Sequence, residues 1–404
     1  MRAARSRTRI GAGAGLGATL AALLLVLAGA RASADEVPAE AVLAVLPFLD
    51  APEPNRIVVD LAPEGSAKPL RLMLDTGASA AMLTPLAARE LGVSIRPHKQ
   101  DPYRRPTRLG RDLQFFIDTS TSDTGSKTAW EYGVFGGQFL SEYVVEIDFP
   151  GRRVRLLDPK RFTVPASVTA SDEAVVPIRL VSQRPGIEVV IDGVKALLML
   201  DTGCPTPAVI SGKLAKRASL TSRPVPGLSG GTVLGPMEVE LGEAKSLRLG
   251  PFEFADVLLE VAPKGWYNIG FPENSVIGYD LLAPFVLRLD YANERLWLRR
   301  ATQAPIRFNG ADVAAYREVG ALLIPKEGRF NTWVVRPDSV AAQRGLRPGD
   351  WIEGMASAEA IAKTLREGEE LTLVRTTNGV GVDTVLEAVA KPTAVSAPPR
   401  GGEP

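Results

Sequence analysis

The chain has 404 residues, of which 45% are hydrophobic and 23% are charged, with a formal net charge of +1. That length is enough for two or three domains, and the charge balance does not indicate a nucleic-acid partner, for which a clustered basic face is expected. One His and one Cys exclude multi-histidine zinc sites, cysteine-rich metal clusters and internal disulfides.

The N-terminus has the pattern of an export signal. Several arginines precede an apolar run from about residue 11 to residue 30, and Ala32, Ser33 and Ala34 form a small-residue cleavage site. We expect residues 1–34 to be a cleaved signal peptide, so that the mature protein is periplasmic or secreted and has no stable membrane span. The alternative is an uncleaved membrane anchor, because the run is nearly long enough to cross a bilayer.

An internal repeat follows the signal. Residues 72–77 read LMLDTG, and the same six letters recur as residues 198–203. Runs rich in β-branched residues precede the two copies, at residues 57–61 and 187–191. Each acid is therefore expected at the end of a buried strand that follows another strand, and the duplication predicts two folded halves of the same β-rich kind.

The repeat extends beyond the acids. Gly136 and Gly278 each follow two apolar residues, and alternating runs at residues 153–156 and 295–298 predict strands with one buried face. A segment rich in Pro, Ser and Thr between the halves reads as a linker. The predicted division is a first half over residues 41–163, a second half over residues 172–303, a third unit over residues 307–390 and a disordered tail over residues 391–404.

A third Asp-Thr-Gly, at residues 123–125, serves as an internal control. It follows the polar run TSTS and reads as a loop. Asp75 and Asp201 instead end apolar strands, where a carboxylate is costly unless something pairs with it. A second carboxylate alongside, sharing one proton, is one physical solution.

With both acid turns and both glycine motifs in this order, residues 50–300 resemble the aspartic proteases, in particular bacterial single-chain relatives of the retropepsins. The resemblance implies a fold dominated by β-structure: a bilobed aspartic-protease (acid protease) β-barrel fold with pseudo-twofold symmetry. It also implies that Asp75 and Asp201 are catalytic. Residues that support the active-site loops would be Thr76 and Thr202, by mutual hydrogen bonds, and the glycines Gly77, Gly203, Gly136 and Gly278.

The chemistry implied by the resemblance is hydrolysis of a peptide bond by water held between the two carboxylates. One proton is shared by the pair, so that one acid acts as general base and the other as general acid. Protein or peptide substrates are expected, with no metal and no other cofactor. A Cys204–His98 pair is formally possible, but nothing in the sequence brings the two residues together.

The second acid turn departs from the family pattern, because Cys204 and Pro205 follow it and Pro207 removes a further backbone donor. Either the site is intact with altered polarity, or this half is losing activity. The glycine-rich residues 227–231 are the candidate for a substrate-covering flap in the second half. The corresponding region of the first half, residues 101–130, is irregular and yields no assigned flap residue.

Residues 334–352 look like the strand, short helix and Gly-Asp turn of a bacterial PDZ domain. A helix is expected over residues 358–366 with Ser357 as its N-cap, followed by strands over residues 370–375 and 380–388. The third unit is thus predicted to be a small α+β PDZ-like domain.

PDZ domains bind an extended peptide as an added strand and capture its C-terminal carboxylate on backbone amides. Gly320 and Leu322 are the candidates for such a loop. The alternative is a domain that only packs on the rest of the protein. Two rivals to the endopeptidase thus remain: a bilobed protein that binds peptides without cutting them, and a PDZ-type adaptor.

Overall fold

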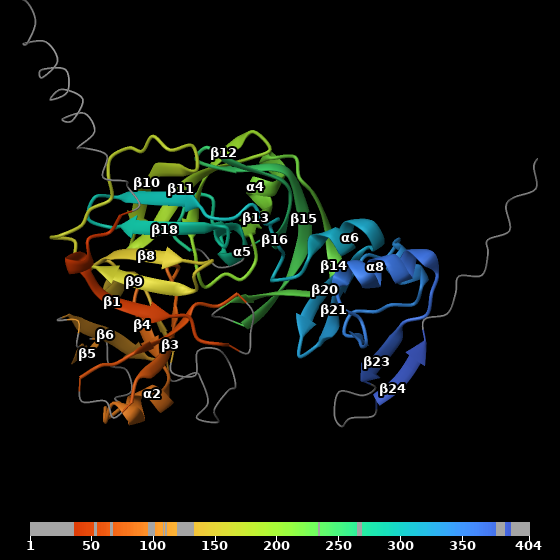
Figure 1. The fold of residues 1–404 in the computed structure, drawn as a ribbon, viewed down its shortest axis with the longest axis horizontal. Coiled ribbons are helices and arrows are strands. Elements are labelled where there is room, and N and C mark those ends of the chain that lie inside the picture. The colour runs from red at the N-terminus through yellow and green to blue at the C-terminus, as the bar shows by residue number, and fades with distance from the viewer. Residues whose placement is uncertain are drawn as a thin grey trace, which may run out of the picture.

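The computed structural model describes residues 36–51, 55–64, 68–95, 102–107, 109, 111–118, 133–232, 235–264, 269–376 and 384–388. Strands dominate the described residues and form three sheets (Figure 1), which confirms the expected fold class dominated by β-structure. No helix among these residues is long and apolar enough to cross a membrane. The expected signal peptide and the expected disordered tail lie outside the described residues.

The first half follows the predicted alternation of short strands and turns. Its elements are η1 (Ala39–Ala41), β1 (Val42–Pro47), β2 (Val58–Leu61), β3 (Leu70–Leu74), β4 (Ala81–Leu83), α2 (Pro85–Glu90), β5 (Tyr103–Pro106), β6 (Asp112–Ile117), β7 (Gly133–Phe135), α3 (Gly137–Leu140), β8 (Val144–Asp148) and β9 (Arg153–Leu157). Helix α2 begins where the side chain of Thr84 accepts a hydrogen bond from Ala87 N and Pro85 occupies the first turn, a favourable start for a helix.

The second half repeats most of this order with longer strands, and among the described residues it has one more strand before its glycine motif. Its elements are β10 (Glu173–Val181), β11 (Arg184–Ile191), β12 (Val194–Leu200), β13 (Ala208–Ser211), α4 (Gly212–Arg217), β14 (Thr221–Thr232), β15 (Gly235–Leu249), β16 (Phe252–Ala262), β17 (Val276–Ile277), α5 (Tyr279–Leu282), β18 (Phe285–Asp290) and β19 (Arg295–Arg300). The pairing repeats too, because β3 lies parallel to β7 as β12 does to β17, and β4 runs antiparallel to β7 as β13 does to β17.

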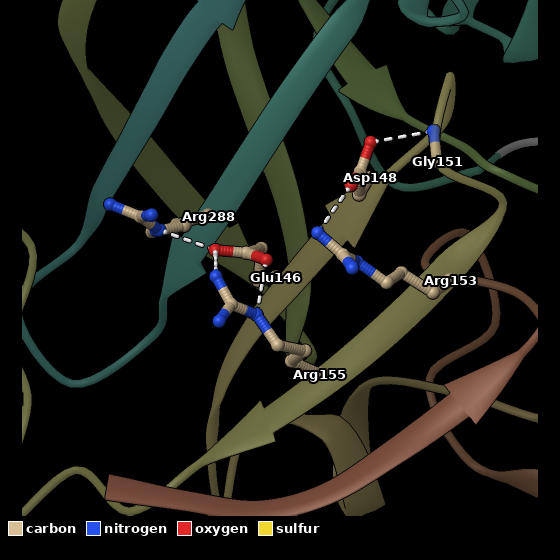
Figure 2. A network of polar contacts seen from close by, with 6 residues as sticks. All are labelled: Glu146, Asp148, Gly151, Arg153, Arg155 and Arg288. Carbon is tan, nitrogen blue, oxygen red and sulfur yellow. Dashed lines mark hydrogen bonds and ion pairs between the residues drawn. The ribbon is translucent and has the colours of Figure 1, made fainter. Parts of the chain in front are cut away.

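Strands β8 and β18 join the two halves as antiparallel neighbours in one sheet. Glu146 on β8 lies between Arg288 on β18, at 2.7 Å, and Arg155 on β9, at 2.5 Å (Figure 2). Burial by itself would raise the pKa of Glu146, but the hydrogen bonds and charges of the two arginines outweigh it and lower the pKa. Asp148 serves a turn, as its side chain accepts a hydrogen bond from Gly151 N at 2.8 Å.

The C-terminal unit is a five-stranded sheet with three helices among the described residues. Its elements are α6 (Val313–Val319), β20 (Ala321–Lys326), β21 (Arg329–Val335), α7 (Val340–Gln343), β22 (Trp351–Ile352), α8 (Ala358–Glu367), β23 (Thr372–Thr376) and β24 (Thr384–Ala388). The side chain of Ser357 caps α8 as expected, by accepting from Ala360 N at 3.1 Å. The expected helix and final strands are thus present with bounds shifted by a few residues.

This unit lies beside β14 and β15 (Figure 1) and shares a core with them. We call the shared apolar group the docking cluster; its buried members are Val225, Val239, Leu241 and Leu258 from the second half, and Phe308, Ala311, Val313, Tyr316, Leu322 and Val334 from the chain that follows it. A hydrogen bond from Arg223 Nη2 to Tyr316 Oη, 2.6 Å long, ties α6 to β14. The C-terminal unit is therefore packed on the hairpin of β14 and β15.

Candidate active site

Each predicted aspartate directly follows a buried strand. Asp75 follows β3 and Asp201 follows β12, and the leucines before them lie in the main core. The backbone N–H of Asp75 donates to Phe135 O at 3.1 Å, and that of Asp201 donates to Ile277 O at 2.9 Å. The two acids are thus held in the same way, each by the strand that leads to a glycine motif.

The threonines beside the acids link the two turns. Thr76 N donates to Thr202 Oγ1 at 3.1 Å, and Thr202 N donates to Thr76 Oγ1 at 3.0 Å. Each hydroxyl in turn donates across to the other half, Thr76 to Leu200 O at 2.7 Å and Thr202 to Leu74 O at 2.9 Å. Both threonines are fully buried. The structure therefore brings the two turns together through four reciprocal hydrogen bonds.

Gly77 and Gly203 face the opposite acids. A Cβ on Gly77 would lie 2.5 Å from Asp201 Cγ, and a Cβ on Gly203 would lie 2.7 Å from Asp75 Cγ. Neither glycine has a left-handed φ, so glycine is needed here because a carboxyl group approaches it closely. Any side chain at either position would displace a carboxyl group.

The second glycine pair lies behind the turns. A Cβ on Gly136 would meet Ala78 O, and a Cβ on Gly278 would meet Thr206 O. The backbone N–H of Gly278 donates to Pro207 O at 2.9 Å. Both glycines also precede short helices, α3 and α5. These contacts support the two loops from behind.

The two carboxyl groups influence each other, and the pKa of each is raised. Burial is the largest cause in both. For Asp201 the negative charge of Asp75 raises the pKa further, which places it well above its ordinary value. The surroundings also differ, because Asp75 Oδ1 accepts from two backbone N–H groups, Gly77 at 2.8 Å and Ala78 at 3.1 Å, whereas Asp201 Oδ1 accepts from Gly203 alone, at 2.9 Å.

Cys204 is a buried thiol in the apolar surroundings of the second turn. Burial, followed by the negative charges of Asp201 and Glu260, raises its pKa, so the thiol stays protonated and is a poor nucleophile. The backbone of Cys204 still holds the loop against α5, because Cys204 O accepts a hydrogen bond from Tyr279 N at 2.8 Å. His98, the formal partner for a cysteine hydrolase, lies outside the described residues.

Two polar residues just before β2 reach across to the second half, and the sequence reasoning missed them. Arg56 Nη1 donates to Gly203 O at 2.7 Å. Asn55 Nδ2 donates to Pro205 O at 2.9 Å and to Asp280 Oδ1 at 2.8 Å. The repeat offered no signal for them, because Arg56 directly precedes the first β-branched run whereas the arginine before the second run, Arg184, stands three residues ahead of it.

Glu260 is a further missed residue. It is 4% exposed on β16. Burial raises its pKa from an ordinary 4.5 to about 7, against the opposing charge of Arg56. In the sequence Glu260 stands inside the apolar run VLLEVA, and a lone acid in such a run is the signal that could have found it.

The hairpin of β14 and β15 contains the glycine-rich residues 227–231, whose backbone lies in β14. The ladder is irregular between Pro224 and Ser229. In the first half, β5 and β6 correspond to β15 and β16, because β6 lies parallel to β4 as β16 does to β13, and the described residues contain no counterpart of β14. The third Asp-Thr-Gly and half of the segment from residue 101 to residue 130 lie outside the described residues.

The candidate peptide-binding residues of the C-terminal unit are engaged in internal contacts. Gly320 ends α6 with a left-handed φ of 81°, and its N–H donates to Tyr316 O at 2.9 Å. Gly320 O accepts from Arg336 N at 2.7 Å, and the side chain of Leu322 is fully buried in the docking cluster. A peptide carboxylate at this loop would have to displace the cap of α6.

Comparison with known proteins relates part of this chain to a protein family. Residues 187–281, which include the Asp201 turn and Gly278, match the family model described as aspartyl protease, and this match supports an aspartic protease family. No curated protein matches the chain.

Two solved structures are similar in part. A retropepsin-like aspartic protease from Rickettsia conorii is 20% identical, with a TM-score of 0.24, over 31% of this chain and 89% of that one. Basic 7S globulin from soybean is 12% identical, with a TM-score of 0.37, over 64% of this chain and 95% of that one.

Proposed function

We propose that this protein is an aspartic endopeptidase that hydrolyses peptide bonds in protein or peptide substrates, with Asp75 and Asp201 as its catalytic pair. Residues 41–163 and 172–303 are its two lobes. The observation that carries the proposal is the reciprocal hydrogen bonding of Thr76 and Thr202, which links the two turns that bear the acids. Paired acids held in this way can activate one water molecule between them.

The surroundings of the two acids support different roles for them. Asp75 accepts two backbone hydrogen bonds and Asp201 one, and such bonds stabilise the charged form of a carboxyl group. Asp75 is therefore the ionised general base that takes a proton from water, and Asp201 holds the shared proton and donates it to the carbonyl oxygen of the substrate. Because the pKa of both acids is raised, the singly protonated pair persists to higher pH than it would for a pair with ordinary pKa values.

The test is cleavage of a denatured protein mixture from pH 3 to pH 8 by the wild type and by Asp75→Asn and Asp201→Asn. We expect both variants to lose at least about 10³-fold in kcat, because each removes one half of the acid–base pair. Asp60→Asn, at an exposed position on β2, is the matched control and should cut like the wild type. A wild type that cuts nothing at any pH, or Asp75 and Asp201 variants that cut equally well, would reject the proposal.

The departure at Cys204 and Pro205 keeps a second candidate open, a bilobed protein that binds peptides without cutting them. The second turn retains both its hydrogen bond from Gly203 N to Asp201 and its contact with Tyr279, which favours the enzyme. Tight peptide binding by a wild type with no turnover would favour the binding protein instead.

We also propose export through a signal peptide at residues 1–34, with an uncleaved membrane anchor as the alternative. N-terminal sequencing of the exported protein tests this proposal, and a mature chain that begins at Met1 would reject it.

For residues 307–390 we propose a PDZ-like role in peptide binding, with a PDZ-type adaptor as the rival function of the protein. Binding of peptides with free and with amidated C-termini tests this role, and equal affinity for both kinds of peptide would reject carboxylate capture.

A further inference from the structure

Glu260 lies on the face of β16 that points away from the main core. Its neighbours Leu259 and Val261 belong to the main core, whereas Leu258 and Ala262 belong to two smaller clusters on the opposite face. Successive side chains of a strand alternate between faces. Glu260 therefore shares its face with Leu258, in the docking cluster, and with Ala262.

The cluster around Ala262 borders the second acid turn. We call it the turn cluster; its buried members are Met199, Cys204, Val209, Ala262, Ile269, Phe271 and Val276. Met199 stands two residues before Asp201, and Met237 from the hairpin strand β15 also packs on the cluster. The turn cluster thus contacts both the strand that leads to Asp201 and the hairpin of β14 and β15.

Strand pairing places Glu260 at the edge of this cluster. Glu260 is the register partner of Val209 on β13, in the turn cluster, and of Leu241 on β15, in the docking cluster. Its charge also acts on the Cys204 thiol. The carboxyl group is therefore bordered by apolar side chains, close to the loop that carries Asp201.

No hydrogen bond or ion pair reaches the Glu260 carboxyl group from the described part of the chain, and the residue is only 4% exposed. Glu146 shows what this chain does with a buried glutamate that has a structural role, because there two arginines lie within 2.7 Å. Arg56 acts on Glu260 through its charge alone. A buried acid without a partner is costly to fold, so a structural role does not account for Glu260.

We propose that Glu260 is a specificity residue that receives the cationic side chain of an arginine or lysine in the substrate, at a subsite beside the Asp201 turn. The inference rests on the proposed function, because it takes the Asp201 turn to be half of the catalytic site. A cation in the substrate would add the direct ion pair that no described residue makes with Glu260. The apolar neighbours Val209 and Leu241 suit the aliphatic stem of such a side chain, and a guanidinium can engage both carboxylate oxygens at once.

The test uses a library of decapeptides in which one position at a time is either arginine or citrulline, its neutral isostere. With the full-length wild type we expect one position, fixed relative to the cut bond, at which arginine raises kcat/KM about 30-fold over citrulline. In Glu260→Gln that ratio should fall below about 3. Glu253→Gln, at an exposed position of the same strand, is the matched control and should keep the ratio of the wild type.

A binding measurement keeps this inference separate from the protease proposal. Fluorescence anisotropy of the same labelled peptides with Asp201→Asn, alone and combined with Glu260→Gln, reports the preference without turnover. If the wild type cuts no peptide while Asp201→Asn still prefers arginine in a way that depends on Glu260, the protease proposal fails and this inference stands. Cleavage or binding with equal values for arginine and citrulline at every position, or a preference that survives in Glu260→Gln, would overturn it. If no peptide is cut or bound, both proposals fail.

Discussion

At the scale of single residues, the junction of the two acid turns depends on the hydroxyl groups of Thr76 and Thr202. Thr76 and Thr202 each accept one hydrogen bond from the opposite turn and donate one to the opposite strand. Because all of these groups are buried, loss of one hydroxyl leaves donors and acceptors without partners, which costs more than a hydrogen bond contributes when formed.

Thr76→Val keeps the shape of the side chain and removes its hydroxyl. We expect the free energy of unfolding to fall by about 1–3 kcal/mol and kcat to fall with it, because the carboxyl groups lose their fixed separation. Urea denaturation and peptide cleavage measure the two effects. Thr76→Ser, which retains the hydroxyl, is the control. Equal stability of the Val and Ser variants would contradict the role given to this hydrogen bond.

At the scale of elements, the junction of β8 and β18 contains an ion pair that is almost fully buried. Glu146 and Arg288 are register partners, and each is 1% exposed. Removing one member leaves an uncompensated buried charge, which lowers the free energy of unfolding more than replacing both members with uncharged residues does. The sequence alone showed two strands with charged residues and no indication that their side chains meet.

Glu146→Gln should lower the free energy of unfolding by about 3–5 kcal/mol, while the double variant Glu146→Gln with Arg288→Met should recover much of the loss. Urea denaturation of the single and double variants checks this. Glu188→Gln removes an exposed partner of Lys195 and should change stability by less than about 1 kcal/mol. A double variant less stable than either single one would contradict the account.

The docking cluster is the other element-scale junction. Phe308 is fully buried there, and its ring lies 5.6 Å from that of Trp333. Phe308→Ala should destabilise the protein by about 3–5 kcal/mol because it leaves a cavity, whereas Val45→Ala, at a residue 55% exposed, should have little effect. Thermal unfolding, monitored separately at the C-terminal unit and at the acid turns, should show that both regions lose stability. Unchanged stability would mean that the unit is not held by this cluster.

At the scale of the whole molecule, raised carboxyl pKa values make stability depend on pH. The pKa of Asp75 and Asp201 is raised, and burial raises that of Glu260 and of Asp280 to about 7 each. A carboxyl group whose pKa is higher in the folded state stabilises the fold below its unfolded pKa and loses that contribution as pH rises through the folded pKa. Glu146 acts oppositely, and its contribution is lost only at more acidic pH.

We therefore expect the free energy of unfolding to fall as pH rises from about 4.5 to about 7.5. Urea midpoints measured across this range check the sign. Glu260→Gln removes one raised group and should flatten the dependence, because its share is on the order of 3 kcal/mol. Stability that rises with pH over this range would contradict the burial of these acids.

The sequence predicted much of the fold because its signals are local. The repeated LMLDTG, the β-branched runs and Ser357 before a helical stretch all report the conformation of a few adjacent residues, and the strands and the helix stand close to where those signals put them. The role expected for Gly136 and Gly278 behind the turns came from the resemblance to the aspartic proteases and not from a local signal.

The sequence could not determine the features that depend on contacts between residues far apart in the chain. The unequal hydrogen bonding of Asp75 and Asp201, the reach of Arg56 to Gly203, and the docking of the C-terminal unit on β14 and β15 appear only when the halves are assembled. Glu260 illustrates the difference: its letter marks an acid in an apolar run, but only strand pairing puts it beside the Asp201 turn. Local conformation is encoded by neighbours in the chain, whereas charge partners and subsites are made by neighbours in space.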